Sequence, residues 1–201
     1  SVPPAVEEAA SRSITDWLGT AIRGSAEPLA EAIARVLRAT GGEPQSTVVG
    51  RGLRTSALLA SLANGAQSHA LDFDDTHLPS IVHPSAPVLP AVLAGAELHG
   101  RSGRDLVRAA AAGLEVCVRL GMAGYDHAAR TSVYFERGQH ATAMCGAVGG
   151  AAAVALLGGL RADGVANAMA VACSMASGIL EANRTGGTVK RLHCGWAAHA
   201  A

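Results

Sequence analysis

The sequence predicts an all-α protein with the architecture of a multi-helix bundle. Alanine (43 residues) and glycine (24) make up a third of the 201 residues. Alanine is the best helix former, and such small side chains let helix backbones approach closely. Hydrophobic residues account for 49% of the chain but aromatic residues for only 3%, so we expect a sizeable, aliphatic core.

Start and stop signals divide the first hundred residues into four helices. Proline is favoured in the first turn of a helix, and glycine commonly follows the last turn. We therefore expect helices from Pro3-Pro4 to Gly24, from Pro28 to Gly41-Gly42, from about Ser56 towards Leu71, and from Ser85 or Ala86 to Gly100. Residues 43–54 and 72–84 are predicted loops, the first with a short extended piece at Thr47–Val49.

The second half continues the helical pattern. Ser102 and Asp105 have the spacing of a capping box, which predicts a fifth helix reaching about Leu120. A long loop over 121–139, helices over about 141–158 and 162–181, and a polar loop over 183–193 follow. The last residues, from Gly195, are helix-like without a stop signal, so we expect the chain to be one part of a longer protein.

Composition excludes several classes of protein. Sixteen basic residues balance sixteen acidic ones, which argues against nucleic acid or a membrane surface as partner. Residues 141–160 carry no charge, but seven alanines and five glycines favour a buried helix over a membrane span. The four cysteines form no CxxC pair and no secretory signal is visible, which predicts reduced thiols, no zinc finger or iron–sulfur cluster, and a cytoplasmic location.

The densest polar cluster lies in the loop 72–84. It contains Asp72, Asp74, Asp75, Thr76, His77 and His83. Crowded carboxylates repel one another, and imidazoles nearby can transfer protons near neutral pH. Three interpretations remain open from these residues alone: proton-transfer chemistry, a divalent-metal or Mg²⁺–diphosphate site, and a solvated loop that caps two helices.

A basic cluster occupies residues 184–193. It holds Lys190, the only lysine among sixteen basic residues, together with Arg191, His193 and the pair Gly186-Gly187. Glycine amides and adjacent cations suit a carboxylate or phosphate ligand, whereas the alternative is a surface loop with incidental charges. His140 alone indicates a cap or core residue; His69, His99, His127 and His199 are interpreted as structural, and Cys194 is not assigned as a nucleophile.

Together these motifs resemble the MmgE/PrpD family. The resemblance covers most of the chain and rests on Asn64-Gly65, the run from His69 to His77, His83-Pro84-Ser85, Gly138-Gln139-His140, and the run from Lys190 to Gly195. It implies that residues 1–201 form the family's helical large domain, with a smaller α+β lid domain missing from this chain. It further implies lyase chemistry on a tricarboxylate such as 2-methylcitrate or cis-aconitate, without a metal or other cofactor. Homodimers, or a partner chain that supplies the lid, are also implied.

The resemblance carries over to Asp72, Thr76, His83, His140 and Lys190, and with less definition to His193. On chemical grounds we expect His83 and His140 to transfer protons and Asp72 to orient an imidazole, without deciding which histidine is acid and which base. Lys190 would bind substrate carboxylates, helped by Arg191, Thr76 and His193. The alternatives are a non-catalytic helical scaffold and an isomerase or epimerase of a related di- or tricarboxylate.

Overall fold

The computed structural model describes residues 2–201, which fold into ten helices and two short antiparallel strand pairs. The all-α prediction is thereby confirmed. The elements in chain order are α1 (Pro4–Gly24), α2 (Pro28–Thr40), β1 (Ser46–Val48), β2 (Leu53–Thr55), α3 (Ala57–Ser68), α4 (Ser85–Leu98), α5 (Gly103–Ala123), β3 (Tyr125–Asp126), β4 (Thr131–Ser132), α6 (Val133–Glu136), α7 (Ala141–Leu157), α8 (Ala162–Met175), α9 (Glu181–Arg184) and α10 (Lys190–Ala200).

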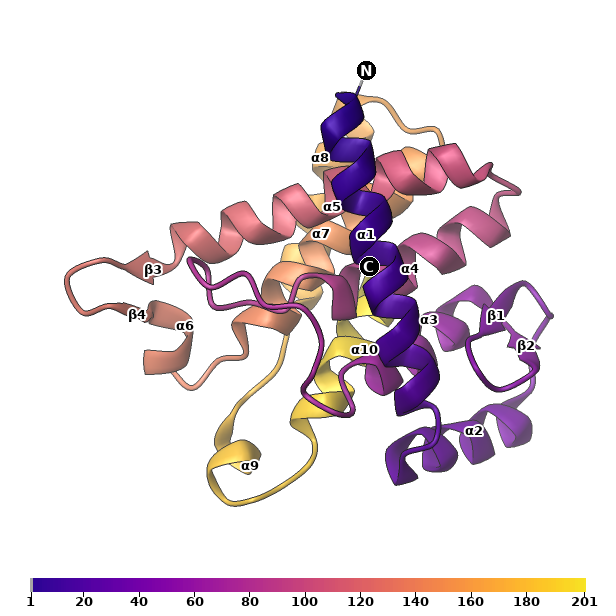
Figure 1. Cartoon of the computed structure of the whole chain (residues 1–201), viewed down its shortest axis with the longest axis horizontal. Helices are drawn as coiled ribbons and strands as arrows, with labels where there is room; N and C mark the ends of the chain where they lie inside the picture. The colour runs from indigo at the N-terminus through magenta and orange to yellow at the C-terminus, as the bar shows by residue number, and fades with distance from the viewer. Residues whose placement is uncertain (1) are drawn as a thin grey trace.

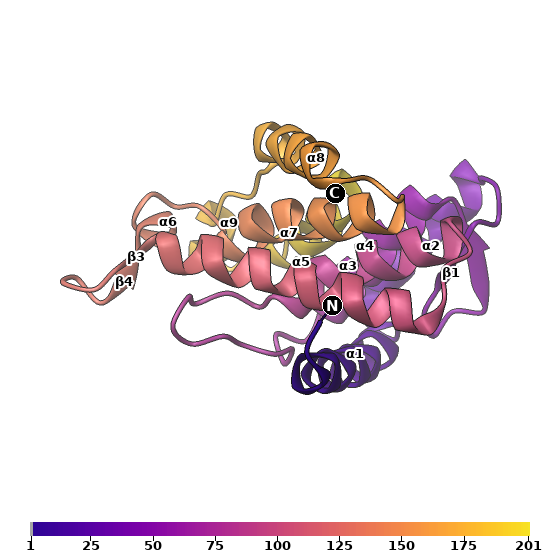
Figure 2. The same cartoon turned by 90° about the horizontal axis from the view of Figure 1, so that it is seen from above.

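The helices are stacked in layers (Figures 1 and 2). Viewed from above, α1 covers one face, α8 covers the opposite face, and α4, α5 and α7 lie between them. The β1–β2 hairpin and α2 lie at one end of the molecule, whereas the β3–β4 hairpin projects at the other. In Figure 1 the loop between α3 and α4 crosses the middle of the molecule, and α9 lies below it near the lower edge.

Helix α7 is the centre of the core, as its composition predicts. All but three of its seventeen residues are buried, and it packs against α4, α5, α8 and α10. Alanine and glycine make this possible: a Cβ on Gly149 would lie 2.5 Å from the carbonyl oxygen of Gly113 on α5. Within the described residues 2–201, no helix combines the length and the apolar character that a bilayer crossing demands.

The contact between α3 and α10 is equally close, and it brings the start of α10 next to the loop that follows α3. A Cβ on Gly65 would lie 2.7 Å from the carbonyl oxygen of Cys194, and a Cβ on Gly195 would collide with the carbonyl oxygen of Leu62. Backbone therefore rests on backbone where the two helices meet. This contact places the first turn of α10 against the end of α3 and the loop that follows α3.

Several predicted boundaries are wrong in instructive ways. The helix expected over 162–181 ends at Met175, because the next residues pair with the segment before α7: His140 N–H donates to Gly178 O, and Leu180 N–H donates to Gly138 O. Helix α10 begins at Lys190, not at Gly195, so the basic cluster lies largely on a helix.

Smaller corrections concern the remaining loops. The third helix ends at Ser68 and not near Leu71, and α5 continues to Ala123. The predicted loop 121–139 contains the β3–β4 hairpin and α6, and the predicted loop 43–54 contains most of the β1–β2 hairpin. The capping box of Ser102 and Asp105 is present as predicted.

The α3–α10 contact predicts a stability effect. Gly195→Ala should lower the free energy of unfolding by about 2 kcal/mol or more, because the added methyl group forces two backbones apart. Gly19→Ala is the matched control: Gly19 is exposed within α1 with no atom near its Cβ position, so alanine should raise stability by about 0.5–1 kcal/mol. Urea denaturation measures both; equal effects of the two substitutions would contradict the proposed contact.

Candidate functional site

The acidic loop and the basic cluster meet in the structure. Lys190 Nζ donates to Asp72 Oδ1 at 2.7 Å, although 118 residues separate them in the sequence. Asp72 has a left-handed backbone (φ 54°), which aspartate tolerates better than most residues. Partial burial opposes ionisation of its carboxyl group, but the hydrogen bond and charge of Lys190, together with the charges of His69 and His83, outweigh this effect and lower the pKa of Asp72.

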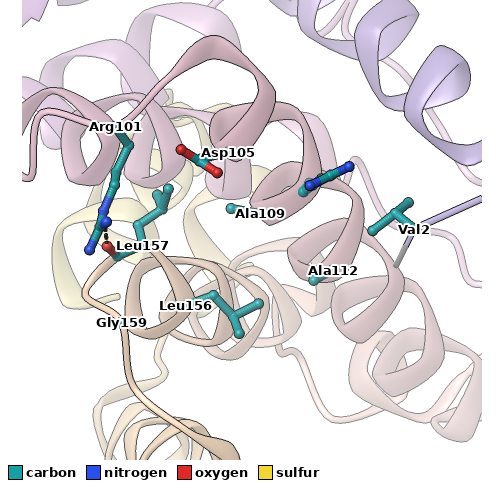
Figure 3. A pocket seen from close by; sticks show the side chains of 9 residues that line it. Val2, Arg101, Asp105, Ala109, Ala112, Leu156, Leu157 and Gly159 are labelled. Carbon is teal, nitrogen blue, oxygen red and sulfur yellow. Dashed lines mark hydrogen bonds between the residues drawn. The ribbon is translucent and has the colours of Figure 1, made fainter.

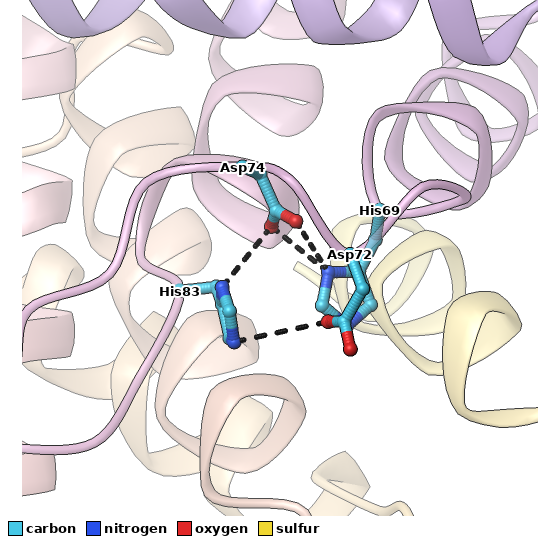
Figure 4. A group of neighbouring side chains, drawn as sticks. All are labelled: His69, Asp72, Asp74 and His83. Carbon is cyan, nitrogen blue, oxygen red and sulfur yellow. Dashed lines mark hydrogen bonds and ion pairs between the residues drawn. The ribbon is translucent and has the colours of Figure 1, made fainter.

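His69 and Asp74 lie behind this ion pair (Figure 4). Their side chains are 0% and 1% exposed, and His69 Nδ1 is 2.8 and 3.0 Å from the two carboxylate oxygens of Asp74. The other ring nitrogen, Nε2, is 3.8 Å from Asp72 Oδ1. Burial by itself lowers the pKa of His69, but the neighbouring Cys194 and Asp74 outweigh it and raise the pKa to about 10.

His83 completes this group from the opposite side of the loop. Its Nδ1 is 3.6 Å from Asp74 Oδ2 and its Nε2 is 4.0 Å from Asp72 Oδ1, while Thr76 Oγ1 lies 3.2 Å from Nδ1. The backbone N–H of His83 donates to Thr142 Oγ1, which fixes the loop on the first turn of α7. The side chain is 20% exposed and can therefore exchange protons with solvent.

His140 immediately precedes α7 and is buried. Its ring is stacked on His69 with centroids 5.8 Å apart, and its Nδ1 is 3.3 Å from His193 Nδ1. Burial, followed by repulsion from His69, His193 and Lys190, lowers the pKa of His140 to about 2. Burial and the same repulsion from His69 and Lys190 also lower the pKa of His193. Both rings are therefore favoured as neutral imidazoles.

A hollow of about 260 Å³ opens beside the Lys190–Asp72 ion pair. Its lining consists of Asp72, Asn183, Gly186, Gly187, Thr188, Lys190 and Arg191. Within residues 2–201, the Arg191 guanidinium has no hydrogen bond or ion pair, so its charge is open to a ligand. The prediction that both glycine amides face an anion needs correction, because Gly187 N–H donates to Ala182 O at 2.6 Å.

The seven residues predicted from the sequence thus lie around one site. The acidic loop supplies Asp72, Thr76 and His83, the start of α7 supplies His140, and the first turn of α10 supplies Lys190, Arg191 and His193. Asp75 instead binds the start of α4: its carboxylate accepts hydrogen bonds from Ser85 N–H and Oγ–H. Burial raises the pKa of Asp75.

Sequence reasoning missed two members of the site, His69 and Asp74. His69 was expected to be structural because the sequence shows no converging partners, but in the structure Asp72, Asp74 and His83 all converge on it. The available signals were its proximity in sequence to the acidic run and its place in the motif run from His69 to His77. Neither signal reveals burial, and the exposed His99 ends α4 in nearly the same backbone conformation in which His69 ends α3.

One subset of these residues has the donor chemistry of a metal site. His69, Asp72, Asp74 and His83 each offer a ligand atom, and these atoms lie within 4.8 Å of one another. The Lys190 ammonium, however, already neutralises Asp72, and His69 Nδ1 already binds Asp74. These two interactions compete with an ion for Asp72 and Asp74, so we derive no chemical step through a metal.

A second hollow, of about 300 Å³, lies between the first half of α5 and the end of α7 (Figure 3). Its polar side chains are committed to the fold. Arg101 Nε–H donates to the Leu157 carbonyl oxygen, Arg108 pairs with Glu7, and Asp105 belongs to the capping box of α5. We therefore place the candidate site at the histidine cluster and not here.

The histidine cluster combines two chemical capacities. Lys190 and Arg191 offer positive charge at a hollow large enough for a small organic acid. His83 lies at the edge of the same cluster with access to solvent, while His140 is a neutral imidazole with Nε2 unpartnered within the described residues. Anion binding next to proton donors is what removal of a carboxyl group or water from an organic acid requires.

Known proteins share this sequence pattern over its whole length. Residues 1–201 match the model of the MmgE/PrpD N-terminal domain. The chain is 32% identical over 202 residues to the cis-aconitate decarboxylase of Aspergillus terreus, covering 98% of this chain and 40% of that protein. It is 34% identical over 198 residues to the human cis-aconitate decarboxylase, covering 96% and 40%. The chain therefore spans about two fifths of the length of these relatives.

The site geometry predicts the charge state of His140. Its imidazole should stay neutral from pH 8 down to about pH 4, because burial and neighbouring cations lower its pKa to about 2. Nitrogen-15 NMR of histidine-labelled protein measures this, with His140→Gln used to assign the signal. Titration of the His140 ring near the ordinary histidine value of about 6.5 would contradict the arrangement described here.

Proposed function

The chain belongs to the MmgE/PrpD family, and on that premise we propose that it is the helical part of a lyase that decarboxylates a tricarboxylate of the cis-aconitate type. A lyase-type activity is what the family and its decarboxylase relatives support. The observation that carries the proposal for this chain is the meeting of Lys190 with the Asp72 loop, beside Arg191 (unpaired within residues 2–201), the buried His140 and the half-buried His193, both of which are favoured as neutral imidazoles.

Decarboxylation of such an acid leaves an electron pair that must be stabilised. When the bond between a CH₂ group and its carboxylate breaks, CO₂ leaves and the electron pair forms a new C=C bond. The electrons of the old double bond move to the carbon beside another carboxylate, and that carbon takes up a proton. The site must therefore hold the remaining carboxylates, stabilise the spread negative charge and deliver one proton.

The residues of this site divide these tasks. Lys190 and Arg191 hold substrate carboxylates at the hollow, and Thr76 offers a hydroxyl that is 3.2 Å from His83. His83 is the proton donor because it reaches solvent and can be reprotonated. His140 and His193 are neutral hydrogen-bonding groups, and Asp72 holds Lys190 in place until the substrate arrives.

Two other reactions use the same groups. Dehydration of a 2-methylcitrate-like acid needs a base as well as an acid, and the lowered pKa of His140 makes that imidazole a weak base. Isomerisation or epimerisation needs only proton removal and return. Decarboxylation is preferred because the relatives at about one-third identity are named decarboxylases. NMR analysis of the products distinguishes all three, and complete inactivity of the full-length protein towards tricarboxylates would favour a non-catalytic scaffold.

The remaining parts of the proposal concern the whole protein. A lid domain, from the same polypeptide or a partner chain, would close over the hollow, and two copies would form a dimer. The exposed apolar side chains of α8 and the segment after it, such as Val171 (64% exposed) and Ile179 (69%), are suited to being covered in that assembly. A cytoplasmic location stays a prediction from the cysteine pattern.

Lys190→Ala tests the anion site. In the full-length enzyme it should reduce kcat/KM roughly 10- to 100-fold, since a hydrogen bond to a charged group contributes about 1.5–3 kcal/mol. Arg184→Ala is the control, because Arg184 is an exposed cation near the same loop that does not line the hollow. Steady-state kinetics measure both variants; wild-type turnover of the Lys190 variant would overturn the assignment.

Metal independence is a separate prediction. Activity should survive exhaustive treatment with a chelator such as EDTA, because Lys190 and not a metal ion neutralises Asp72. The measurement is the rate before and after chelation, followed by addition of Mg²⁺, Mn²⁺ or Zn²⁺. Loss of activity that a divalent ion restores would show that the four potential ligands do hold a metal.

A further inference from the structure

The candidate site contains two carboxylates, although the proposed substrate is itself a polyanion. Asp72 and Asp74 lie within one cluster, and Lys190 balances only one of them. Without another cation, this part of the site would carry a net negative charge and would repel the ligand that Lys190 is meant to bind. A second positive charge close to Asp74 would remove that repulsion.

His69 is placed to supply that charge. Its Nδ1 contacts both oxygens of the Asp74 carboxylate at 2.8 and 3.0 Å, and its Nε2 faces Asp72 Oδ1 at 3.8 Å. Nε2 has no hydrogen-bond partner within the described residues, but the negative charges of Asp74 and Asp72 close to the ring favour its doubly protonated form. The Asp74 side chain is 1% exposed, and a carboxylate buried to that extent needs a cationic or hydrogen-bonding partner.

We propose that His69 is a positioning residue: as a buried imidazolium it balances the Asp74 carboxylate, so that Lys190 has only Asp72 to balance and Arg191 stays available to hold a polyanionic substrate. This inference rests on the proposed function for its substrate but not for the charge of His69. His69 is fully buried and absent from the lining of the hollow, so it acts through Asp72, Asp74 and the neighbouring rings and does not touch the ligand.

The groups that face His69 come from three parts of the chain. They are Asp72, Asp74 and His83 from the acidic loop, His140 from the start of α7, and His193 and Cys194 from α10. A charged His69 accounts for the neutral state of the nearest of these rings, because His140 is stacked on it at 5.8 Å. The raised pKa of His69, about 10, agrees with the same assignment.

The charge of His69 can be measured without any assay of activity. Nitrogen-15 NMR of histidine-labelled wild-type protein at pH 8 should show both His69 nitrogens protonated, and Asp74→Asn should make that ring neutral. A His69 ring that is neutral at pH 8 in the wild-type protein would overturn the proposal. This measurement stays informative whether or not the protein proves to be a tricarboxylate decarboxylase.

The kinetic test uses a charge-neutral replacement. His69→Gln keeps a hydrogen-bond donor for Asp74 but removes the charge, and should raise KM for the tricarboxylate roughly tenfold or more. The double variant His69→Gln/Asp74→Asn removes both charges of the pair, so it should recover most of the lost affinity. A purely structural role predicts the opposite result, with the double variant worse than either single variant.

His99→Gln is the matched control. His99 follows α4 as His69 follows α3, and their backbone dihedrals are nearly equal: φ −95° and ψ 5° for His99, φ −94° and ψ 2° for His69. His99, however, is exposed and has no carboxylate partner within the described residues. It should leave KM and kcat unchanged. A double variant that is no better than His69→Gln, together with a folded protein by circular dichroism, would refute the charge-balancing role. Failure of Lys190→Ala to affect turnover would instead refute the proposed function.

Discussion

The backbone contact between α3 and α10 is the constraint on which the rest of the site depends. Two glycines, Gly65 and Gly195, let the helices touch where any side chain would hold them apart. That contact places the end of α3, with His69 and the acidic loop, beside the first turn of α10, with Lys190 and His193. The geometry of the candidate site is thus a consequence of helix packing.

The charges brought together by this packing limit one another. Two cations 5.8 Å apart repel by about 3 kcal/mol at an effective dielectric constant of 20, which is roughly two pKa units. If His69 is charged, His140 must therefore be neutral, and burial adds to the same effect. A site with several histidines consequently does not hold several equivalent acids: their order of protonation follows from which ring faces carboxylates and which faces other rings.

Local signals predicted where helices begin better than where they end. Proline at Pro4 and Pro28 and the capping box at Ser102 act within one turn, so a sequence window contains them entirely. The end of α8 at Met175 depends instead on pairing between the segment 178–180 and the residues before α7. The same distinction applies to the site. The motif residues were identified from resemblance, but His69 and His99 look alike locally, and only tertiary packing buries one of them between carboxylates.

The charge balance also indicates how much positive charge residues 2–201 can offer to a substrate. If His69 neutralises Asp74 and Lys190 neutralises Asp72, Arg191 is the one cation of the hollow in excess within the described residues. A substrate carboxylate can displace Asp72 from Lys190, but that exchange frees an anion as it binds one. A tricarboxylate with three negative charges would therefore gain little net attraction from these residues alone. On the proposed function, tight binding requires further cations from the part of the protein that closes over the hollow, so closure and charge compensation would be a single event.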